Sequence, residues 1–301
     1  MWIDDLNDLV LLPRGRQYEA LQTLRQKTQA ADHEQWNTTF DSTSLYQAWT
    51  RLPLAQGVYE VNRPVIRRAI AGREDWRIVE IGGGNGALWQ EFFADAPPGT
   101  LTLIDPNQNA HTAVAGRLPE HVELHSIIEP AETADIPGCD VLVCSLTLHH
   151  VAGRDTQERA AFGLDGVGKL EILQRCLAAI RDRAGVAVLN EADCYHEIDL
   201  APGDPALIDS FIDAYVRRTA RAVADTMARS GDGDESSHPW QLILRHWCLD
   251  EVDYAFADRA DRDVYELDVA SWLALLARAG ARDVNHIYSD EWNLFVQYVF
   301  G

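Results

Sequence analysis

The sequence predicts an α/β protein built around a mostly parallel sheet, and three observations support this. Helical patterns without a strand occupy the first 72 residues. Five short apolar runs then alternate with helical segments, and the chain ends in two strand-like runs about three residues apart. Strands that alternate with helices form βαβ units, whose parallel strands are covered on both faces. A connection of about three residues instead forces antiparallel pairing, because a parallel crossover needs a dozen residues or more.

Periodicity and apolar runs locate the individual elements. Residues 14–30 predict one helix, and a further helix is expected to begin at Asn62, with Pro64 in its first turn. The apolar runs predict strands at 76–81, 101–105, 122–127, 140–144 and 186–190. Helices are expected between these strands at 86–95, 107–117 and 157–182.

The C-terminal part of the chain combines an insertion with the hairpin. Residues 266–280 predict an amphipathic helix capped by Gly280, followed by antiparallel strands at 282–289 and 293–301. About 75 residues lie between the fifth strand and this hairpin, too many for a simple loop. Because they contain further helical patterns, we interpret 191–265 as a cap inserted over the active site.

Charge and composition exclude several classes of partner. The 301 residues carry a formal net charge of −21, and so acidic a surface repels nucleic-acid backbones and anionic lipid. No run approaches the ~18 consecutive apolar residues that a membrane span needs. The N-terminal MWIDDLNDLV lacks the basic region of a signal peptide, and the five cysteines form no CxxC pair. We therefore expect a cytoplasmic protein without nucleic-acid or membrane partners, of an oligomeric state that the sequence leaves open.

A glycine-rich loop is the sharpest local motif. The segment VEIGGGNG follows a predicted strand and contains Gly82, Gly84 and Gly86, which allow a sharp turn and a close approach of backbone amides to a ligand. Glu80 lies near the end of the first strand, and Asp105 follows the second strand. A carboxylate at the end of the second strand can accept hydrogen bonds from both hydroxyls of a ribose. The motif therefore predicts a nucleoside-binding site.

In these features the sequence resembles the class I S-adenosylmethionine-dependent methyltransferase family, over about 76–190 by motif and over 266–301 by strand order. The resemblance implies a Rossmann-like, seven-stranded sheet of order 3-2-1-4-5-7-6 with only the last strand antiparallel. Residues 1–72 are then expected to form an N-terminal helical lid, and 73–301 the cofactor-binding domain that carries the cap at 191–265.

The resemblance also implies roles for single residues. The segment matching Glu80–Gly86 would hold the methionine portion and ribose of S-adenosylmethionine, Asp105 would bind the ribose diol, and Pro106 would lie near adenine. In the family, an acid after the third strand contacts the adenine amino group. Both Glu129 and Glu132 match it, the first by its distance from the strand and the second by its spacing to a following proline.

Two further segments are expected to contact the cofactor. After the fourth strand, CSLTLHHV (144–151) is similar to a Leu-His-His run that lines the floor between cofactor and acceptor in the family. Ser145 in this run is assigned to the cofactor side. In the N-terminal region, Tyr46 lies on a short polar-aromatic segment rather than on a regular apolar face, and we expect it to close over the cofactor.

A NAD(P)-binding Rossmann unit is the alternative interpretation of the glycine loop. Gly82-x-Gly84-x-x-Ala87 satisfies the looser dinucleotide fingerprint. Three features favour S-adenosylmethionine instead: an acid precedes the glycines, the third glycine has GxGxG spacing, and the chain ends in the antiparallel hairpin.

Four residues near the cofactor loops are candidates for the chemistry. Methyl transfer is an in-line displacement of a good leaving group, so the protein supplies proximity, alignment and, where needed, a base. His149 and His150 follow the fourth strand, and an imidazole can act as a base near neutral pH. Tyr195 and His196 follow the fifth strand, where contacts to an acceptor often arise.

No metal is expected. The cluster Asp193, His196, Glu197 and Asp199 mixes the residue types that bind metals, but it contains no HxxxH or paired-carboxylate spacing. Scattered acids of this kind are expected at this net charge.

The leading functional hypothesis is transfer of a methyl group from S-adenosylmethionine to a small-molecule metabolite, in secondary or specialised biosynthesis, leaving S-adenosylhomocysteine. A first alternative is attack on the γ-carbon of the cofactor, which releases methylthioadenosine during 3-amino-3-carboxypropyl transfer or cyclisation to azetidine-2-carboxylate. No motif separates these reactions. A non-catalytic protein that binds the cofactor or a partner is the alternative of another class, disfavoured by the intact glycine loop together with Asp105.

Overall fold

Seven strands of the computed structural model form one mixed sheet in the order β3-β2-β1-β4-β5-β7-β6. The structure describes residues 2–29, 49–151, 167–195, 200–230, 250–258, 260, 262 and 264–301. The strands are β1 Trp76–Ile81, β2 Gly99–Ile104, β3 Val122–Ile127, β4 Val141–Ser145, β5 Val186–Ala192, β6 Asn285–Tyr288 and β7 Phe295–Phe300. β7 pairs antiparallel with β5 and with β6, and the other pairs are parallel. The predicted strand order, with only the last strand antiparallel, is confirmed.

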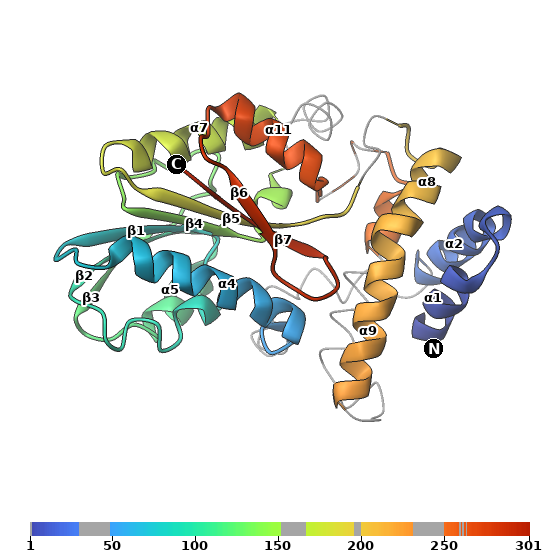
Figure 1. Ribbon diagram of the computed structural model, residues 1–301, viewed down its shortest axis with the longest axis horizontal. Coiled ribbons are helices and arrows are strands. Elements are labelled where there is room, and N and C mark those ends of the chain that lie inside the picture. Colours follow the sequence, from blue (N-terminus) through green and yellow to red (C-terminus); the bar gives the residue numbers. More distant parts are fainter. Residues whose placement is uncertain are drawn as a thin grey trace.

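Helices cover both faces of the sheet (Figure 1). On one face, α7 (Val167–Arg181) and α11 (Val269–Ala279) pack on each other, and α7 contacts β4 and β5. On the other face lie α4 (Pro53–Ile70) and α5 (Gln108–Ala115). Each face has its own buried apolar cluster, so the strands between them are covered on both sides, as their near-continuous apolar sequence predicts.

The helix α4 begins earlier than the sequence predicts. We expected a helix from Asn62 with Pro64 in its first turn, but the helix begins at Pro53 and Pro64 lies in its interior. An interior proline removes the hydrogen bond to the carbonyl four residues before it. Here both Pro64 and Glu60 are exposed, so water can satisfy the carbonyl of Glu60. Pro53 takes the favoured first helical position.

The predicted helix at 86–95 is wrong. Only the 3₁₀ turn η2 (Ala87–Trp89) and further turns occur there. Glu91 has a positive φ of 57°, which a regular right-handed helix does not allow. The segment instead buries an aromatic stack in which Phe93 lies between Trp76 and Trp89, with both ring-centroid distances 5.1 Å. Burial of these rings explains why tertiary packing outweighs helical periodicity at this position.

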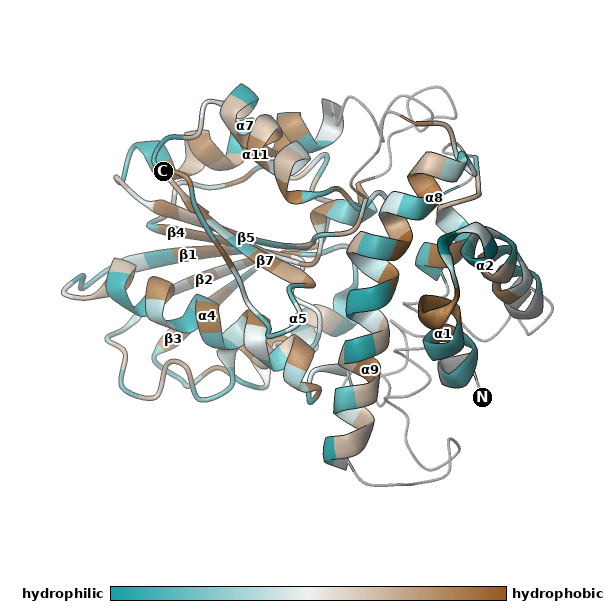
Figure 2. Ribbon diagram, turned by 45° about the vertical axis from the view of Figure 1, so that its right-hand side comes forward, coloured by the Kyte–Doolittle hydropathy of each residue, from teal (hydrophilic) through white to brown (hydrophobic). Residues whose placement is uncertain are grey.

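The N-terminal helices and the inserted region form a helical layer beside the sheet (Figures 1 and 2). In this layer, α1 (Trp2–Leu11) packs on α9 (Arg217–Ser230), and α2 (Arg14–Gln29) packs on α8 (Pro205–Phe211). The turn η4 (Ile212–Val216), a π-helical turn, joins α8 to α9. A third apolar cluster joins this layer to residues of α4, β5 and β7.

The first 72 residues are therefore divided between two environments. The helices α1 and α2 pack on the inserted helices, whereas α4 contacts β4, β5 and β7 of the sheet. The domain boundaries at 72 and at 191–265 stay predictions. Among the described residues, no helix combines the length and apolar character needed to cross a lipid bilayer.

Candidate active site

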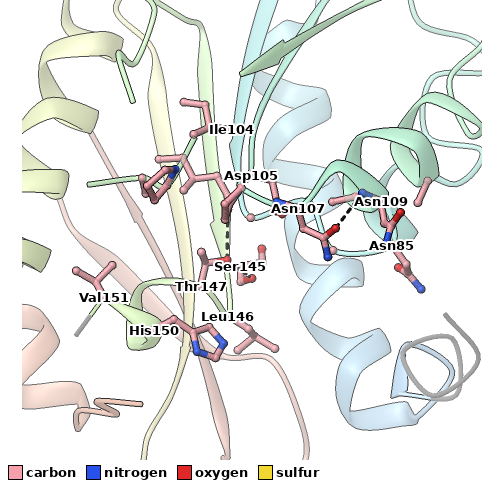
Figure 3. A pocket seen from close by; sticks show the side chains of 18 of the residues that line it. Asn85, Ile104, Asp105, Asn107, Asn109, Ser145, Leu146, Thr147, His150 and Val151 are labelled. Atoms are coloured by element: carbon pink, nitrogen blue, oxygen red, sulfur yellow. Dashed lines mark hydrogen bonds between the residues drawn. The ribbon is translucent and has the colours of Figure 1, made fainter. Parts of the chain in front are cut away.

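A cavity of about 440 Å³ lies where β1, β2 and β4 end (Figure 3). Ligands of open α/β sheets bind outside the carboxyl ends of the strands, where connections diverge to either face. The residues that line this cavity come from the segments that follow the first four strands: Ile81, Gly82, Gly84, Asn85, Ile104, Asp105, Pro106, Asn107, Asn109, Ala110, Ala113, Pro130, Ala131, Glu132, Ser145, Leu146, Thr147, His150 and Val151.

The glycine loop fits closely between neighbouring elements. Gly82, Gly84 and Gly86 all have positive φ angles, of 77°, 51° and 71°. A Cβ added at Gly82 would lie 2.1 Å from Oγ1 of Thr147, so glycine is required there by both conformation and space. Gly82 and Gly84 line the cavity, whereas Gly86 is not among the lining residues.

The carboxylate of Asp105 is fixed by backbone amides. Its Oδ2 accepts a hydrogen bond of 3.0 Å from the amide of Gly83, and its Oδ1 accepts one of 2.8 Å from the amide of Asn107. His111 Nε2 lies 2.9 Å from the Asp105 carbonyl oxygen. Because a carboxylate offers about four lone pairs, each oxygen can still accept a hydrogen bond from a ligand in the cavity. The structure thus places a preoriented acid on the cavity wall, and its contact with a ribose stays a prediction.

Glu80 does not line the cavity. Its Oε2 accepts a hydrogen bond of 2.6 Å from the indole Nε1 of Trp89, beneath the glycine loop. Burial raises the pKa of Glu80 to about 8; the nearby Asp105 acts in the same direction, and the hydrogen bond from Trp89 acts against it. The acid of the motif therefore ties the first strand to the turn η2. Glu80 is not a lining residue of the cavity, and its contact with the cofactor stays a prediction.

The acids after the third strand differ in position. Both are exposed, but Glu132 lines the cavity and Glu129 is not a lining residue. Pro106 and Ser145 line the cavity, and their contacts with a cofactor stay predictions. Tyr46 lies outside the described residues.

A buried carboxylate organises the turn after β4. Oε1 of Glu191, in β5, accepts hydrogen bonds from the amides of Thr147 (3.2 Å) and Leu148 (2.7 Å). Oε2 of the same side chain lies 2.7 Å from Nδ1 of His149. Both histidines belong to the short 3₁₀ turn η3 (Leu148–His150), and their Nε2 atoms lie 3.0 Å apart. Glu191 thus holds the turn that carries the two candidate bases.

The two histidines have opposite electrostatic environments. Burial disfavours the charged form of His149, but Glu266 and then Glu191 outweigh it and raise the pKa of His149 to about 9. His150 keeps exposed surface at the cavity, yet the surrounding protein, the charge on His149 and Lys169 hold the pKa of His150 well below its usual range. The pKa of His149 is therefore raised by its carboxyl neighbours, whereas that of His150 is lowered.

The cluster around His149 is interpreted as a buried ion pair rather than a metal centre. His149, Glu191 and Glu266 offer ligand-type atoms within 4.8 Å of one another. However, Glu191 already accepts hydrogen bonds from two amides and from His149. The buried Lys169 also interacts electrostatically with both glutamates, and burial raises the pKa of Glu266 to about 8, which makes this carboxyl group a poor metal ligand at neutral pH.

The remaining catalytic candidates follow β5. Tyr195 is buried away from the cavity lining, where its hydroxyl donates a 3.1 Å hydrogen bond to the Glu251 carbonyl oxygen and its ring stacks on Phe211. These contacts give Tyr195 a packing role at the base of the helical layer. His196 lies outside the described residues.

The sequence analysis missed the buried residues that support the site. Glu191 was overlooked, although a charged residue inside an apolar strand is a signal, since such a residue is rarely buried without partners. Ser145 was predicted, but the residues that hold it were not. Asn62 of α4 donates hydrogen bonds to Ser145 Oγ (3.1 Å) and to Asn190 Oδ1 (2.7 Å). Gln297 of β7 in turn donates a hydrogen bond to Asn62 (2.8 Å). Nothing local in the sequence predicts that these four residues meet.

Several solved structures are similar to this chain at low identity. A SAM-dependent methyltransferase from Leishmania major is 14% identical with a TM-score of 0.45, over 86% of this chain and 82% of that one. Human N-acetylserotonin methyltransferase in complex with SAM is 14% identical with a TM-score of 0.45, over 92% of this chain and 61% of that one. A protein described as a pericyclic reaction enzyme is 16% identical with a TM-score of 0.42, over 78% and 46%.

This chain spans less than two thirds of the length of the last two proteins. No family model matches the sequence, and no curated protein matches it. At these identities and TM-scores the likenesses carry no information about the reaction.

Proposed function

We propose that this protein binds S-adenosylmethionine and transfers its methyl group to a small molecule. The charge of the cavity is the observation that carries the proposal. The lining contains the two carboxylic acids Asp105 and Glu132, and none of its described residues is a lysine or arginine. Such a lining favours a cationic ligand over an anionic one. S-adenosylmethionine is cationic at its sulfonium, carries a ribose diol for the predicted acid and supplies an electrophilic methyl carbon when bound.

The same features disfavour a dinucleotide. The pyrophosphate of NAD binds at the N-terminus of a helix that follows the glycine loop. In this protein the loop leads into the three-residue turn η2 and no regular helix follows before β2. Because the described lining also offers no basic side chain, a pyrophosphate would be poorly neutralised there.

Individual roles follow from position along the cavity. Asp105, fixed by two backbone amides, would accept the ribose hydroxyls. Between the two candidates for the adenine amino group, the cavity lining favours Glu132 over Glu129. Gly82 and Ser145 lie at the ends of β1 and β4, on the side expected to hold the methionine portion.

A small-molecule acceptor is supported by the surroundings of the cavity. The helical layer built by α1, α2, α8 and α9 lies beside the sheet (Figure 1), and a cavity of about 440 Å³ at the ends of the strands suits a compact ligand. The net charge of −21 further disfavours a nucleic-acid acceptor.

A mass-spectrometric assay tests the reaction. The protein is incubated with S-adenosylmethionine alone and with panels of hydroxyl, amine, thiol and carboxylate acceptors, and the released nucleoside is identified. S-adenosylhomocysteine that forms only with an acceptor supports the proposal. Methylthioadenosine above the uncatalysed background supports attack on the γ-carbon instead: cyclisation if no acceptor is needed, and aminocarboxypropyl transfer if one is. Release of neither nucleoside across the panel contradicts the enzymatic proposal.

Calorimetry tests the cofactor site independently of any acceptor. We expect Asp105→Ala to weaken binding of S-adenosylhomocysteine by about 2 kcal/mol or more, because a charged acceptor of two hydrogen bonds is lost. Asp105→Asn, which keeps one carbonyl oxygen for the backbone amides, should show a smaller loss. Asp95→Ala, at an exposed position outside the cavity lining, is the matched control. Equal affinities in the wild type and Asp105→Ala would remove Asp105 from the ribose site.

A further inference from the structure

A buried network of polar side chains reaches the cavity wall at Ser145. Asn62 of α4, Asn190 of β5 and Gln297 of β7 are at most 3% exposed, and none of them lines the cavity. Ser145, at the end of β4, is partly exposed and is a lining residue (Figure 3). Buried amide side chains are costly unless they are hydrogen-bonded, and this network satisfies them in part through Ser145. Ser145 is therefore the member of the network that can contact a ligand.

Asn62, Asn190 and Ser145 form a closed triangle of hydrogen bonds. Nδ2 of Asn62 donates to Oδ1 of Asn190 (2.7 Å) and to Oγ of Ser145 (3.1 Å). Oγ of Ser145 donates to Oδ1 of Asn190 (3.1 Å), and Nε2 of Gln297 donates to Oδ1 of Asn62 (2.8 Å). A hydroxyl group has one hydrogen and two lone pairs. The triangle uses the hydrogen and one lone pair of Ser145, so one lone pair is left for the cavity.

The same lone pair is left if the amides are turned. Nδ2 of Asn190 has no hydrogen-bond partner among the described residues. Turning all three side-chain amides by 180° would let this group donate to Asn62 and Ser145, while Asn62 would donate to Gln297. Ser145 would again accept one hydrogen bond from an amide and donate one to another. In both arrangements Ser145 offers the cavity a hydrogen-bond acceptor.

The strand order indicates which part of a nucleoside ligand reaches Ser145. β1 pairs with β2 on one side and with β4 on the other. Asp105 directly follows β2 and Ser145 ends β4, so the two residues flank the glycine loop, about 10 Å apart across two strand spacings. In the proposed function, Asp105 accepts the ribose hydroxyls, and Glu132, after β3, is nearest to adenine. The methionine portion, at the other end of the molecule, then lies toward β4.

We propose that Ser145 recognises the α-ammonium group of S-adenosylmethionine, and that Asn62 and Asn190 hold its hydroxyl as a hydrogen-bond acceptor. This inference rests on the proposed function and deepens it, because it assigns the residues that distinguish the amino-acid end of the cofactor. Ser145 is a specificity-determining residue that touches the cofactor, and the two asparagines are positioning residues that act through it.

Hydrogen-bond accounting favours the ammonium over the carboxylate of the methionine portion. An ammonium group only donates hydrogen bonds, and a carboxylate only accepts them. The ammonium can use the remaining lone pair of Ser145 while the triangle stays intact. A carboxylate would require Ser145 to turn its hydrogen toward the cavity, which breaks its hydrogen bond within the triangle. The charge of the described lining acts in the same direction, because it contains Asp105 and Glu132 but no lysine or arginine.

Calorimetry with four nucleosides and the full-length protein tests which group is recognised. Two of them carry the ammonium group: S-adenosylhomocysteine and its analogue with hydrogen in place of the carboxylate. The other two lack it: the analogue with hydrogen in place of the ammonium group, and 5′-methylthioadenosine, which has neither group. Ser145→Ala should weaken binding of the first two about tenfold or more, because a hydrogen bond to a charged group is lost. Binding of the other two should equal that of the wild type.

Ser126→Ala is the matched control, at an exposed position of β3 outside the cavity lining, and should bind all four ligands like the wild type. Other patterns of loss in Ser145→Ala overturn the proposal. A loss confined to the two ligands with a carboxylate would show that Ser145 recognises that group instead. An equal loss for all four would show that Ser145 only supports the cavity. Unchanged affinities for all four would remove Ser145 from the site.

Variants of the two asparagines separate positioning from support of the fold. Asn62→Leu and Asn190→Leu each remove one of the two hydrogen bonds that fix the hydroxyl of Ser145, which can then rotate. The preference for S-adenosylhomocysteine over the analogue without the ammonium group should fall about threefold or more. Affinity for 5′-methylthioadenosine should stay that of the wild type. An unchanged preference in both variants, or a loss shared by all four ligands, contradicts the positioning role. Ser145→Ala tests the recognised group even if a leucine variant fails to fold.

The outcomes also distinguish this inference from the proposed function. If binding depends on Ser145 as expected but no acceptor yields S-adenosylhomocysteine, the proposed reaction fails and the recognition of the ammonium group stands. If methyl transfer occurs while Ser145→Ala binds all four ligands like the wild type, the reaction stands and the inference fails. If none of the four ligands binds to the wild type, both are contradicted.

Discussion

At the scale of single residues, Glu80 shows how a motif residue can have a structural role. Its carboxyl group is buried beneath the glycine loop and accepts a hydrogen bond from Trp89. Burial, reinforced by Asp105, raises the pKa of Glu80 to about 8, far above the ordinary value near 4.5. Between these two pH values the unfolded chain ionises this group and the folded protein does not. Stability is therefore lost progressively as pH rises from 4.5 to 8.

Glu80→Gln is expected to stabilise the protein near pH 7.5. Glutamine keeps an oxygen for the indole of Trp89 but does not ionise, so the free energy of unfolding should rise by about 1–3 kcal/mol. At pH 4 the gain should disappear, because the carboxyl group is then largely protonated in both states. Urea unfolding of both proteins at the two pH values measures this difference. A gain of equal size at both would show that burial of the charge is not its cause.

At the scale of elements, the loop after β1 and the turn after β4 are fitted to each other. Gly82 adopts a φ of 77°, and a Cβ there would lie 2.1 Å from Oγ1 of Thr147. The hydroxyl of Thr147 lies 3.0 Å from the carbonyl oxygen of Ser145 and 3.3 Å from that of Ile81, and it can donate its proton to either. This contact brings the glycine loop against the turn that carries His149 and His150. The shape of the cavity therefore depends on the distance between the glycine loop and the turn after β4, which are far apart in sequence.

A set of alanine variants can separate strain from collision. Gly72→Ala meets a positive φ of 74° but open space, and should cost about 1 kcal/mol. Gly82→Ala adds the collision with Thr147 and should cost about 3 kcal/mol. Adding Thr147→Ala removes the two closest contacts and should recover part of this loss. Thermal unfolding of the variants measures these costs. Equal losses at Gly72 and Gly82 would mean that the loops separate freely.

At the scale of the whole molecule, segments far apart in sequence build one helical layer. Tyr18 of α2 donates a hydrogen bond to the carbonyl of Gly203 (3.0 Å), and Arg25 pairs with Asp253 (2.6 Å). Figure 2 shows apolar surface of α1 turned toward the other helices of this layer. The apolar cluster of this layer also includes Val58 of α4 and Phe295 of β7 but no residue of β1 or β4, so the layer can loosen while β1 and β4 stay folded.

A buried charge in α2 is expected to loosen the helical layer selectively. Leu21 is fully buried, so Leu21→Asp places an unpaired carboxylate in the apolar cluster and should increase hydrogen exchange in 205–230. The strands β1 and β4 should keep their protection. Leu11→Asp, at a position 81% exposed, is the matched control. Exchange in 205–230 that equals the wild type in both variants would contradict a shared core.

The sequence by itself determined the fold class and the position of the site. Five apolar runs that alternate with predicted helices indicate a parallel sheet, and the short link at 289–294 between the last two strands favours antiparallel pairing, because both are consequences of local chain geometry. Gly82 and Asp105 follow β1 and β2 directly, so the parallel arrangement alone brings them to one edge. Their contacts with a cofactor stay predictions, and so do those of the other candidate residues.

Only the tertiary structure decided which side chains support that site. The parallel register pairs Ser145 of β4 with Asn190 of β5, which places Glu191 beside the turn of His149. Where the sequence predicted a helix, packing of Trp89 favours the turn η2, and the indole of Trp89 donates a hydrogen bond to Glu80. The contact between Glu191 and His149 depends on strand register, because these residues lie more than 40 positions apart in the sequence. The turn at Trp89 depends on burial of its ring. Periodicity and motif spacing describe neighbours along the chain, so they carry no information on such contacts.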